Sequence, residues 1–409
     1  MAIPPRKIIN DPVHGFITIN DPLIFEIISH PFYQRLRRIH QMALAQLVYP
    51  GAVHTRLHHS LGAYHLMCTA IAELKDKGVD ITDEEAQAAK AAILLHDIGH
   101  GPFSHALEQV LLKGVSHEDI SLLIMKSLNA AQNEKLNGKL TLAIQIFTNQ
   151  YHKKFLYQLI SGQLDVDRLD YLSRDSFFTG VSEGVIGYQR ILKMLTVQDQ
   201  ALVVEEKGIT SVEKFLVSRR LMYWQVYMHK SVVAAEKMLV KIMERAQWLY
   251  QHAKEGIATG SSLDHFLEPF SGKIEDIDLA AYCQLDDIDI LSAIKKWQHH
   301  SDKVLSILCT RILNRKCYKC KMQSEPINEN DWNKASAQVK ATFNLSDEEL
   351  PFLCFKGEAS NTLYKQGDET IKILLKNGEL STISDIDNAL INESLSAPVK
   401  KFYICLLNE

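Results

Sequence analysis

The chain has 409 residues, which is more than one compact domain usually contains, and this length predicts two or three structural units. Its composition, with 46% hydrophobic and 23% charged residues, is that of an ordinary globular protein and excludes a disordered or fibrous chain. The formal net charge of −4 gives no indication of a nucleic-acid-binding surface, and no uninterrupted apolar stretch of about 18 residues predicts a membrane span.

The first residues lack the apolar core of a signal peptide, and the seven cysteines are an odd number scattered along the chain. This pattern fits a reducing compartment better than a disulfide framework, so we expect a cytoplasmic protein. Cys317 and Cys320 have the spacing of half a zinc ribbon, but no second such pair follows. Free thiols are therefore the favoured interpretation of these cysteines.

The first 20 residues contain short extended segments separated by turn signals at Asn10-Asp11-Pro12 and His14-Gly15. From about 21 to 256 the apolar residues recur mainly at helical spacing, which predicts a mostly α region. The expected helices cover 22–29, 32–48, 59–76, 83–97, 104–112, 117–130 and 210–255, and a small hairpin is expected at 203–208.

A Gly/Ser-rich stretch at 256–273 predicts a loop or a boundary, and helical periodicity returns over 273–315. After about 316 the pattern changes to short β-type runs around one expected helix near 331–342. The β-type runs lie at 352–356, 370–376 and 402–407, and Asn377-Gly378 indicates a hairpin. We therefore expect a domain at 1–256, a helical connection at 257–315 and a small α+β region at 316–409.

The densest group of reactive side chains follows an apolar helix expected to end near Leu95. His96 and Asp97 stand at that end, where an ionised carboxylate in apolar surroundings is costly unless a cation balances it. Segments containing His59 upstream and Asp167 downstream can supply further ligands. Mixed imidazole and carboxylate ligands suit Mn, Fe, Ni, Zn or Mg and argue against a thiolate site. A helix cap with a buried core histidine is the alternative interpretation.

The order His59, His96-Asp97, Asp167 resembles the H…HD…D signature of the HD-domain phosphohydrolases. The resemblance is more specific to the HD-domain dNTP triphosphohydrolases of vertebrates and bacteria, and it covers roughly residues 5 to 240. It rests on the runs 10–15, 34–37, 50–52, 56–62, 96–105, 117–118 and 165–175. It implies a mostly α, HD-type helical catalytic core that holds a divalent metal with His59, His96, Asp97 and Asp167, followed by a smaller C-terminal α+β region.

Three further histidines are candidates for proton transfer. His100 comes four residues after His96 and faces the same cavity if the helix continues, and Glu108 follows His105 at a spacing that lets it orient the imidazole. His117 begins another expected helix. The resemblance implies that His100, His105 and His117 contact the α-phosphate or protonate the leaving oxygen, with the division of roles left open. A capping or surface histidine is the alternative for His105 and His117.

A phosphate-bearing substrate needs cations, and in an acidic protein they must be placed locally. Arg56, Arg168 and Arg219 are the candidates, although each alone can equally be a solvated or salt-bridged residue. The resemblance implies that Tyr171 and Tyr227, together with these arginines, hold phosphate and exclude a ribose 2′-hydroxyl. Arg168 stands where the vertebrate enzyme carries lysine, which preserves the charge.

The resemblance also implies a reaction in which a dNTP is hydrolysed to a deoxynucleoside and triphosphate. The metal centre alone equally permits a phosphatase or phosphodiesterase that acts on another nucleotide. A third possibility is a nucleotide-sensing HD protein without turnover, and the intact histidines count against it. The sequence leaves the metal and the base preference open.

A regulatory nucleotide site is implied by the same resemblance. In the vertebrate family members a guanine nucleotide between subunits contacts residues that correspond to Asn10, Gln34 and Arg37, and the tetramer is active. Gln34 and Arg37 can face one ligand, because they are three residues apart on an expected helix. Ser29 replaces an acidic residue that reads the guanine edge, so guanine selectivity should be weaker. We expect a homo-oligomer, either dimer or tetramer; the alternative is that Gln34 and Arg37 form only structural contacts.

Overall fold

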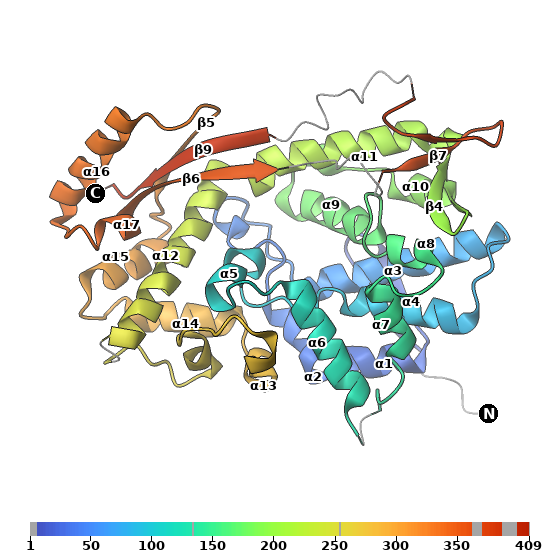
Figure 1. The fold of residues 1–409 in the computed structure, drawn as a ribbon, viewed down its shortest axis with the longest axis horizontal. Coiled ribbons are helices and arrows are strands. Elements are labelled where there is room, and N and C mark those ends of the chain that lie inside the picture. The colour runs from blue at the N-terminus through green and yellow to red at the C-terminus, as the bar shows by residue number, and fades with distance from the viewer. Residues whose placement is uncertain (1–5, 133–134, 253–254, 362–369, 387–398, 409) are drawn as a thin grey trace.

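The computed structural model of the chain describes residues 6–132, 135–252, 255–361, 370–386 and 399–408. These residues form a mostly helical molecule with three small sheets (Figure 1). The predicted fold class, a helical core with a smaller α+β region towards the C-terminus, is confirmed. Within the described part of the chain, none of the helices combines the length and apolar character needed to cross a lipid bilayer.

The N-terminal segment is a hairpin of β1 (Lys7–Asp11) and β2 (Gly15–Ile19), as the extended pattern and turn signals predict. Gly15 has a φ of +76°, a backbone conformation that glycine adopts at no steric cost. One face of the hairpin buries Ile17 and Ile19 against the helices.

Two of the helices at the site, α4 and α9, begin at side-chain caps. Thr82 and Glu85 form a reciprocal capping box for α4, and Asp165 accepts a hydrogen bond from a backbone N–H at the start of α9. The helices of this region are α1 (Pro22–Ser29), α2 (Pro31–Gln34), α3 (Arg56–Asp76), α4 (Asp83–Leu95), α5 (Glu108–Leu111), α6 (His117–Ala130), α7 (Thr141–Phe147), α8 (Lys154–Gln158), α9 (Val166–Thr179), α10 (Tyr188–Met194), α11 (Ile209–Met222) and α12 (Lys230–His252).

Helices α3, α4 and α9 pack closely around the site. Gly62 of α3 lies directly against α9, where a Cβ atom would come within 2.0 Å of a carboxylate oxygen of Asp170 and 2.2 Å of the guanidinium of Arg174. Alanines of α4, including Ala89 and Ala92, are fully buried in the same core. Small side chains therefore let polar groups of α9 approach α3 inside the core.

The expected helix at 32–48 is wrong as a continuous element. After α2 the chain makes only 3₁₀ turns at Arg35–Arg38 and Ala45–Leu47. The buried guanidinium of Arg35 donates hydrogen bonds to the carbonyls of Ile98 at 2.8 Å and Leu285 at 3.0 Å, and Ala43 has a φ of +44°. These long-range contacts outweigh the local helical preference of the segment.

Two other helices are interrupted, and the hairpin lies earlier than predicted. The expected helix at 104–112 divides into a 3₁₀ turn and α5, and that at 210–255 divides into α11, a five-residue π-helical turn at Tyr223–Tyr227, and α12. The hairpin expected at 203–208 is formed by β3 (Leu195–Gln198) and β4 (Ala201–Glu205).

The C-terminal half contributes to both ends of the molecule (Figure 1). Strands β5, β9 and β6 form an antiparallel sheet, whereas β7 pairs in parallel with β4. The hairpin signal at Asn377-Gly378 is confirmed, because it joins β7 to β8. The elements are α13 (Leu279–Tyr282), α14 (Asp287–Trp297), α15 (Lys303–Leu313), β5 (Lys319–Gln323), α16 (Glu329–Phe343), α17 (Leu350–Leu353), β6 (Cys354–Asn361), β7 (Lys372–Leu374), β8 (Leu380–Thr382) and β9 (Val399–Leu406).

Candidate metal centre and active-site cavity

The four side chains expected to bind a metal lie together. His59 comes from the first turn of α3, His96 and Asp97 from the end of α4, and Asp167 from the start of α9. The Nε2 atom of His59 is 3.0 Å from Oδ1 of Asp167 and 3.7 Å from Oδ2 of Asp97. The Nε2 atom of His96 is 3.3 Å from Oδ1 of Asp97 and 3.6 Å from Oδ1 of Asp167. Two imidazoles and two carboxylates thus face one point.

The hydrogen bonds of the two imidazoles fit a bound cation. Nδ1 of His59 donates to Asp170 at 2.7 Å, and Nδ1 of His96 donates to the carbonyl of Ile93 at 2.6 Å. Both Nε2 atoms are buried and have no hydrogen-bond partner among the described residues. In a neutral imidazole these atoms carry lone pairs that face carboxylate oxygens, so a divalent ion is the group that satisfies both.

The four candidate ligands His59, His96, Asp97 and Asp167 are here called the cage. The charges around them favour a bound cation. Burial lowers the pKa of His59, but the nearby carboxylates of Asp167 and Asp170 raise it more strongly, to about 10. Burial raises the pKa of Asp97, whereas His96 and Arg56 hold it well below its usual range. A metal bound by neutral imidazoles supplies the same charge.

A buried network that the sequence analysis did not identify holds His59 in place. Besides His59, Asp170 accepts hydrogen bonds from Nε2 of His14 at 2.7 Å and from Arg174 at 3.0 Å. Arg174 also donates to Asp11 at 2.8 Å. The spacing of Asp170 and Arg174 after Asp167 on one helix was the available signal, because positions three and four apart share a helix face.

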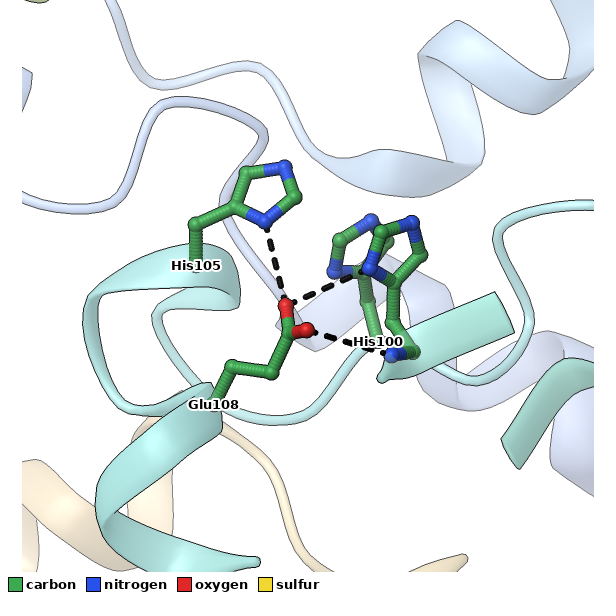
Figure 2. Close-up of side chains that lie close together, drawn as sticks. His100, His105 and Glu108 are labelled. Carbon is green, nitrogen blue, oxygen red and sulfur yellow. Dashed lines mark hydrogen bonds and ion pairs between the residues drawn. The ribbon is translucent and has the colours of Figure 1, made fainter. Parts of the chain in front are cut away.

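A second group, here called the imidazole group, consists of His100, His105, Glu108 and His117 (Figure 2). Oε2 of Glu108 accepts hydrogen bonds from Nδ1 of His105 at 3.1 Å and Nδ1 of His117 at 3.2 Å. The ring of His100 stacks on that of His117 with centroids 3.8 Å apart. Burial raises the pKa of Glu108, but its hydrogen bonds with both imidazoles hold it well below its usual range. One carboxylate thus orients two imidazoles.

His100 connects the metal ligands to the imidazole group. It is buried, and its Nε2 atom lies 3.4 Å from Oδ1 of Asp97. Burial and the nearby Arg56 hold the pKa of His100 well below its usual range, so its ring is neutral near pH 7. In contrast to the buried His100, the side chain of His105 is 70% exposed to solvent.

The loop between His100 and His105 is strained and held from outside the expected catalytic region. Phe103 and Ser104 are buried with φ values of +53° and +52°. Oδ1 of Asp287 accepts a hydrogen bond from the backbone N–H of Phe103 at 2.7 Å, and Oδ2 accepts one from the backbone N–H of His40 at 2.8 Å. The first residue of α14 thus positions this loop, a contact that sequence spacing does not reveal.

The candidate phosphate-binding arginines have different surroundings. Arg56 donates to Asp97 and, at 2.9 Å, to Ser104, so its charge lies beside the metal ligands. Arg219 has a buried Nη1 atom with no partner among the described residues. Arg168 pairs instead with Asp165, its own helix cap.

A cavity of about 530 Å³ is lined by metal-ligand candidates, by histidines of the imidazole group and by two of the candidate arginines. Asp97 and Asp167 form one part of its wall, and His100, His105 and His117 form another. Of the candidate substrate-binding residues, the cavity is lined by Arg56, Tyr171, Arg219 and Tyr227. Asp175 was not predicted, yet it lines the cavity and accepts hydrogen bonds from Tyr227 at 2.6 Å and His54 at 2.7 Å.

The candidate regulatory residues lie near the N-terminus. Asn10 is in β1, where it pairs with Phe16 of β2. Oε1 of Gln34 accepts a hydrogen bond from Arg37 at 2.7 Å, and the Gln34 amide donates to the carbonyl of Ile28 at 2.6 Å. Gln34 and Arg37 thus contact each other, and the nucleotide site implied by the resemblance stays a prediction.

Comparison with known families gives two adjoining matches. The model of the HD domain matches residues 56–175, and that of the HD associated region matches residues 186–259. The first match contains the four metal-ligand candidates and the imidazole group, whereas Asp287 lies beyond both.

Individual proteins resemble the chain over most of its length. It is 33% identical to the uncharacterised protein YwfO of Bacillus subtilis over 401 residues, covering 96% of this chain and 89% of the relative. It is 27% identical to the deoxynucleoside triphosphate triphosphohydrolase SAMHD1 of Gallus gallus over 370 residues, covering 80% of this chain and 57% of that protein. A solved phosphohydrolase from Bacteroides thetaiotaomicron matches with a TM-score of 0.93 and 47% identity, covering 99% of this chain and 100% of the other.

Proposed function

Because this chain belongs to the HD-domain phosphohydrolases, we propose that it hydrolyses a dNTP to the deoxynucleoside and triphosphate. The observation that carries this proposal is one cavity, in which two metal-ligand carboxylates, the three histidines of the imidazole group, two arginines and three tyrosines meet. A cavity of this size is suited to a nucleotide.

His59, His96, Asp97 and Asp167 would hold the metal, and their ligand types suit Mn, Fe, Ni, Zn or Mg. When bound, such an ion lowers the pKa of water and stabilises negative charge on phosphoryl oxygens. Asp170 and the carbonyl of Ile93 keep both imidazoles in the tautomer that presents Nε2 to the ion.

The arginines provide the positive charge that a polyphosphate requires. Arg219 lines the cavity with a buried nitrogen that has no hydrogen-bond partner in the described part of the chain, and Arg56 lies beside the metal ligand Asp97. Charge-assisted hydrogen bonds from these guanidinium groups orient phosphate oxygens. Arg168 pairs with Asp165 and adds positive charge near the start of α9, where it acts on the phosphates through the electrostatic field.

The imidazole group supplies the proton that the departing 5′ oxygen requires. In the proposed reaction a water oxygen loses a proton and bonds to the α-phosphorus, the bond from phosphorus to the 5′ oxygen breaks, and that 5′ oxygen gains a proton, so the number of protons is conserved. His105 or His117 donates this proton from Nε2, because the Nδ1 atoms of both are engaged by Glu108. The buried, neutral His100 supports His117 by stacking.

Released products decide the reaction. We expect the metal-loaded protein to release inorganic triphosphate from dNTPs in a nucleotide panel in which the metal is varied. Release of single phosphate or pyrophosphate would identify a different phosphohydrolase, and binding without turnover would identify a nucleotide sensor. His96→Ala serves as the matched inactive control.

We further propose a homo-oligomer with a nucleotide site at the N-terminal hairpin. The outward face of the hairpin carries Asn10 between Ile8 and Phe16, whose exposed fractions are 54% and 71%. Such an apolar face suits contact with a second copy. Sedimentation and activity with and without GTP and dATP test this proposal, and a fully active monomer indifferent to both nucleotides would contradict it.

A further inference from the structure

One wall of the cavity is aromatic. Tyr171 follows Asp167 by one helical turn, and its ring centroid is 6.4 Å from that of Tyr227. The ring centroid of Tyr227 is in turn 6.0 Å from that of Tyr223, and all three tyrosines line the cavity. The wall therefore leads from a metal ligand towards the start of α12, and its faces are suited to stacking with a planar ring.

Beyond this wall lies a carboxyl group that the mechanism does not use. Glu236 lines the cavity from α12, one turn after Val232, which also lines it. Its side chain has no hydrogen bond or ion pair with any described residue. The pKa of Tyr223 is raised by burial, lowered by Arg219 and raised by Glu236, which places Tyr223 near both groups.

Burial and a neighbouring lysine act in opposite directions on the pKa of Glu236. Lys237, its neighbour in sequence, is the charged group that lowers its pKa, while burial raises that pKa to about 7. The carboxyl group of Glu236 is partly exposed and lines the cavity, so a hydrogen-bond donor on a ligand can reach it.

We propose that Glu236 binds the exocyclic amino group of the nucleobase and makes the enzyme discriminate against thymine. Adenine, guanine and cytosine each present an amino group, whereas thymine presents carbonyl oxygens on both sides of its ring N–H. Those oxygens repel a carboxylate oxygen. The inference rests on the proposed dNTP hydrolysis, because it requires the base to lie at the tyrosine wall while the phosphates lie at the arginines.

The test compares kcat/KM for the four dNTPs in the wild type, Glu236→Leu and Glu236→Gln. In Glu236→Leu we expect the values for the amino-bearing bases to fall about 10- to 100-fold, the effect of losing one hydrogen bond to a charged group. The value for dTTP should change less than about threefold. Glu236→Gln keeps an acceptor oxygen and should recover part of the preference.

Two controls keep the outcome clear. Glu244→Gln changes an acid on the same helix that pairs with Lys241, and it should leave all four values unchanged. Inhibition by inorganic tripolyphosphate reports the phosphate end and should be the same in every variant. An unchanged base ranking in Glu236→Leu, or an equal loss for all four dNTPs, overturns the inference alone. Absence of dNTP turnover in the wild type overturns the proposed function, and the inference with it.

Discussion

The metal-ligand cage and the imidazole group lie side by side but are supported very differently. In the cage, each imidazole is buried and bonded through Nδ1 to a second buried partner, Asp170 or the carbonyl of Ile93. In the imidazole group, His105 and His117 share the single carboxylate of Glu108.

From this difference we infer that the cage is the more rigid part and the imidazole group the more adjustable one. Three helices and a buried ionic network determine the positions of the cage ligands, whereas the imidazole group depends on a strained loop and one acid. A rigid cage suits a metal with defined ligand geometry, and an adjustable imidazole suits a donor that must follow a departing oxygen. Substitutions should therefore separate loss of metal from loss of turnover.

The largest effect is expected from the cage ligands. Asp167→Ala and His96→Ala should each lose bound metal and activity together, because three remaining ligands no longer hold the ion in catalytic geometry. Metal analysis of the purified variants, alongside steady-state rates, checks this. Full activity in either variant would contradict the metal assignment.

A smaller loss of turnover is expected from substitutions in the imidazole group. His105→Ala and His117→Ala should keep the metal but lose turnover by roughly 10²- to 10⁴-fold, as expected for a positioned proton donor. The same two measurements apply. Parallel loss of metal would mean that these histidines are ligands and would remove the distinction between the two groups.

A smaller effect is expected from the network behind the cage. Asp170→Asn keeps the shape of the side chain but removes the charge that holds Nδ1 of His59, so metal affinity should fall roughly 10- to 100-fold. Excess metal should restore most of the turnover. Titration of the apo-protein with metal measures the effect, and an unchanged affinity would show that the helices alone orient His59.

The smallest effect is on the pH dependence of stability. Because the folded-state pKa of Glu108 is depressed, its contribution is present above the unfolded pKa of roughly 4 and is lost as the pH falls through the folded value. The stability difference between wild type and Glu108→Gln should therefore be present at about pH 5 and shrink below roughly pH 4. Urea midpoints across this range measure it, and a constant difference would contradict the role of Glu108.

Local pattern was sufficient for the mostly α fold class and for helices such as α1 and α6. The candidate set His59, His96, Asp97 and Asp167 came from the resemblance to a family signature. Helical periodicity and capping residues depend on neighbours within one or two turns, so they can be read from sequence. The ordered histidines and aspartates likewise lie on or beside such helices.

Contacts between distant segments could be established only from the three-dimensional structure. Glu108 reaches His117 across a loop, Asp287 holds Phe103 from α14, and β7 joins the sheet of β4. Segment 32–48 does not form the continuous helix that its sequence pattern predicts, because the hydrogen bonds of Arg35 to distant carbonyls outweigh the local helix propensity. Such contacts depend on how distant segments pack in the core, and residue spacing along the chain contains no information about that packing.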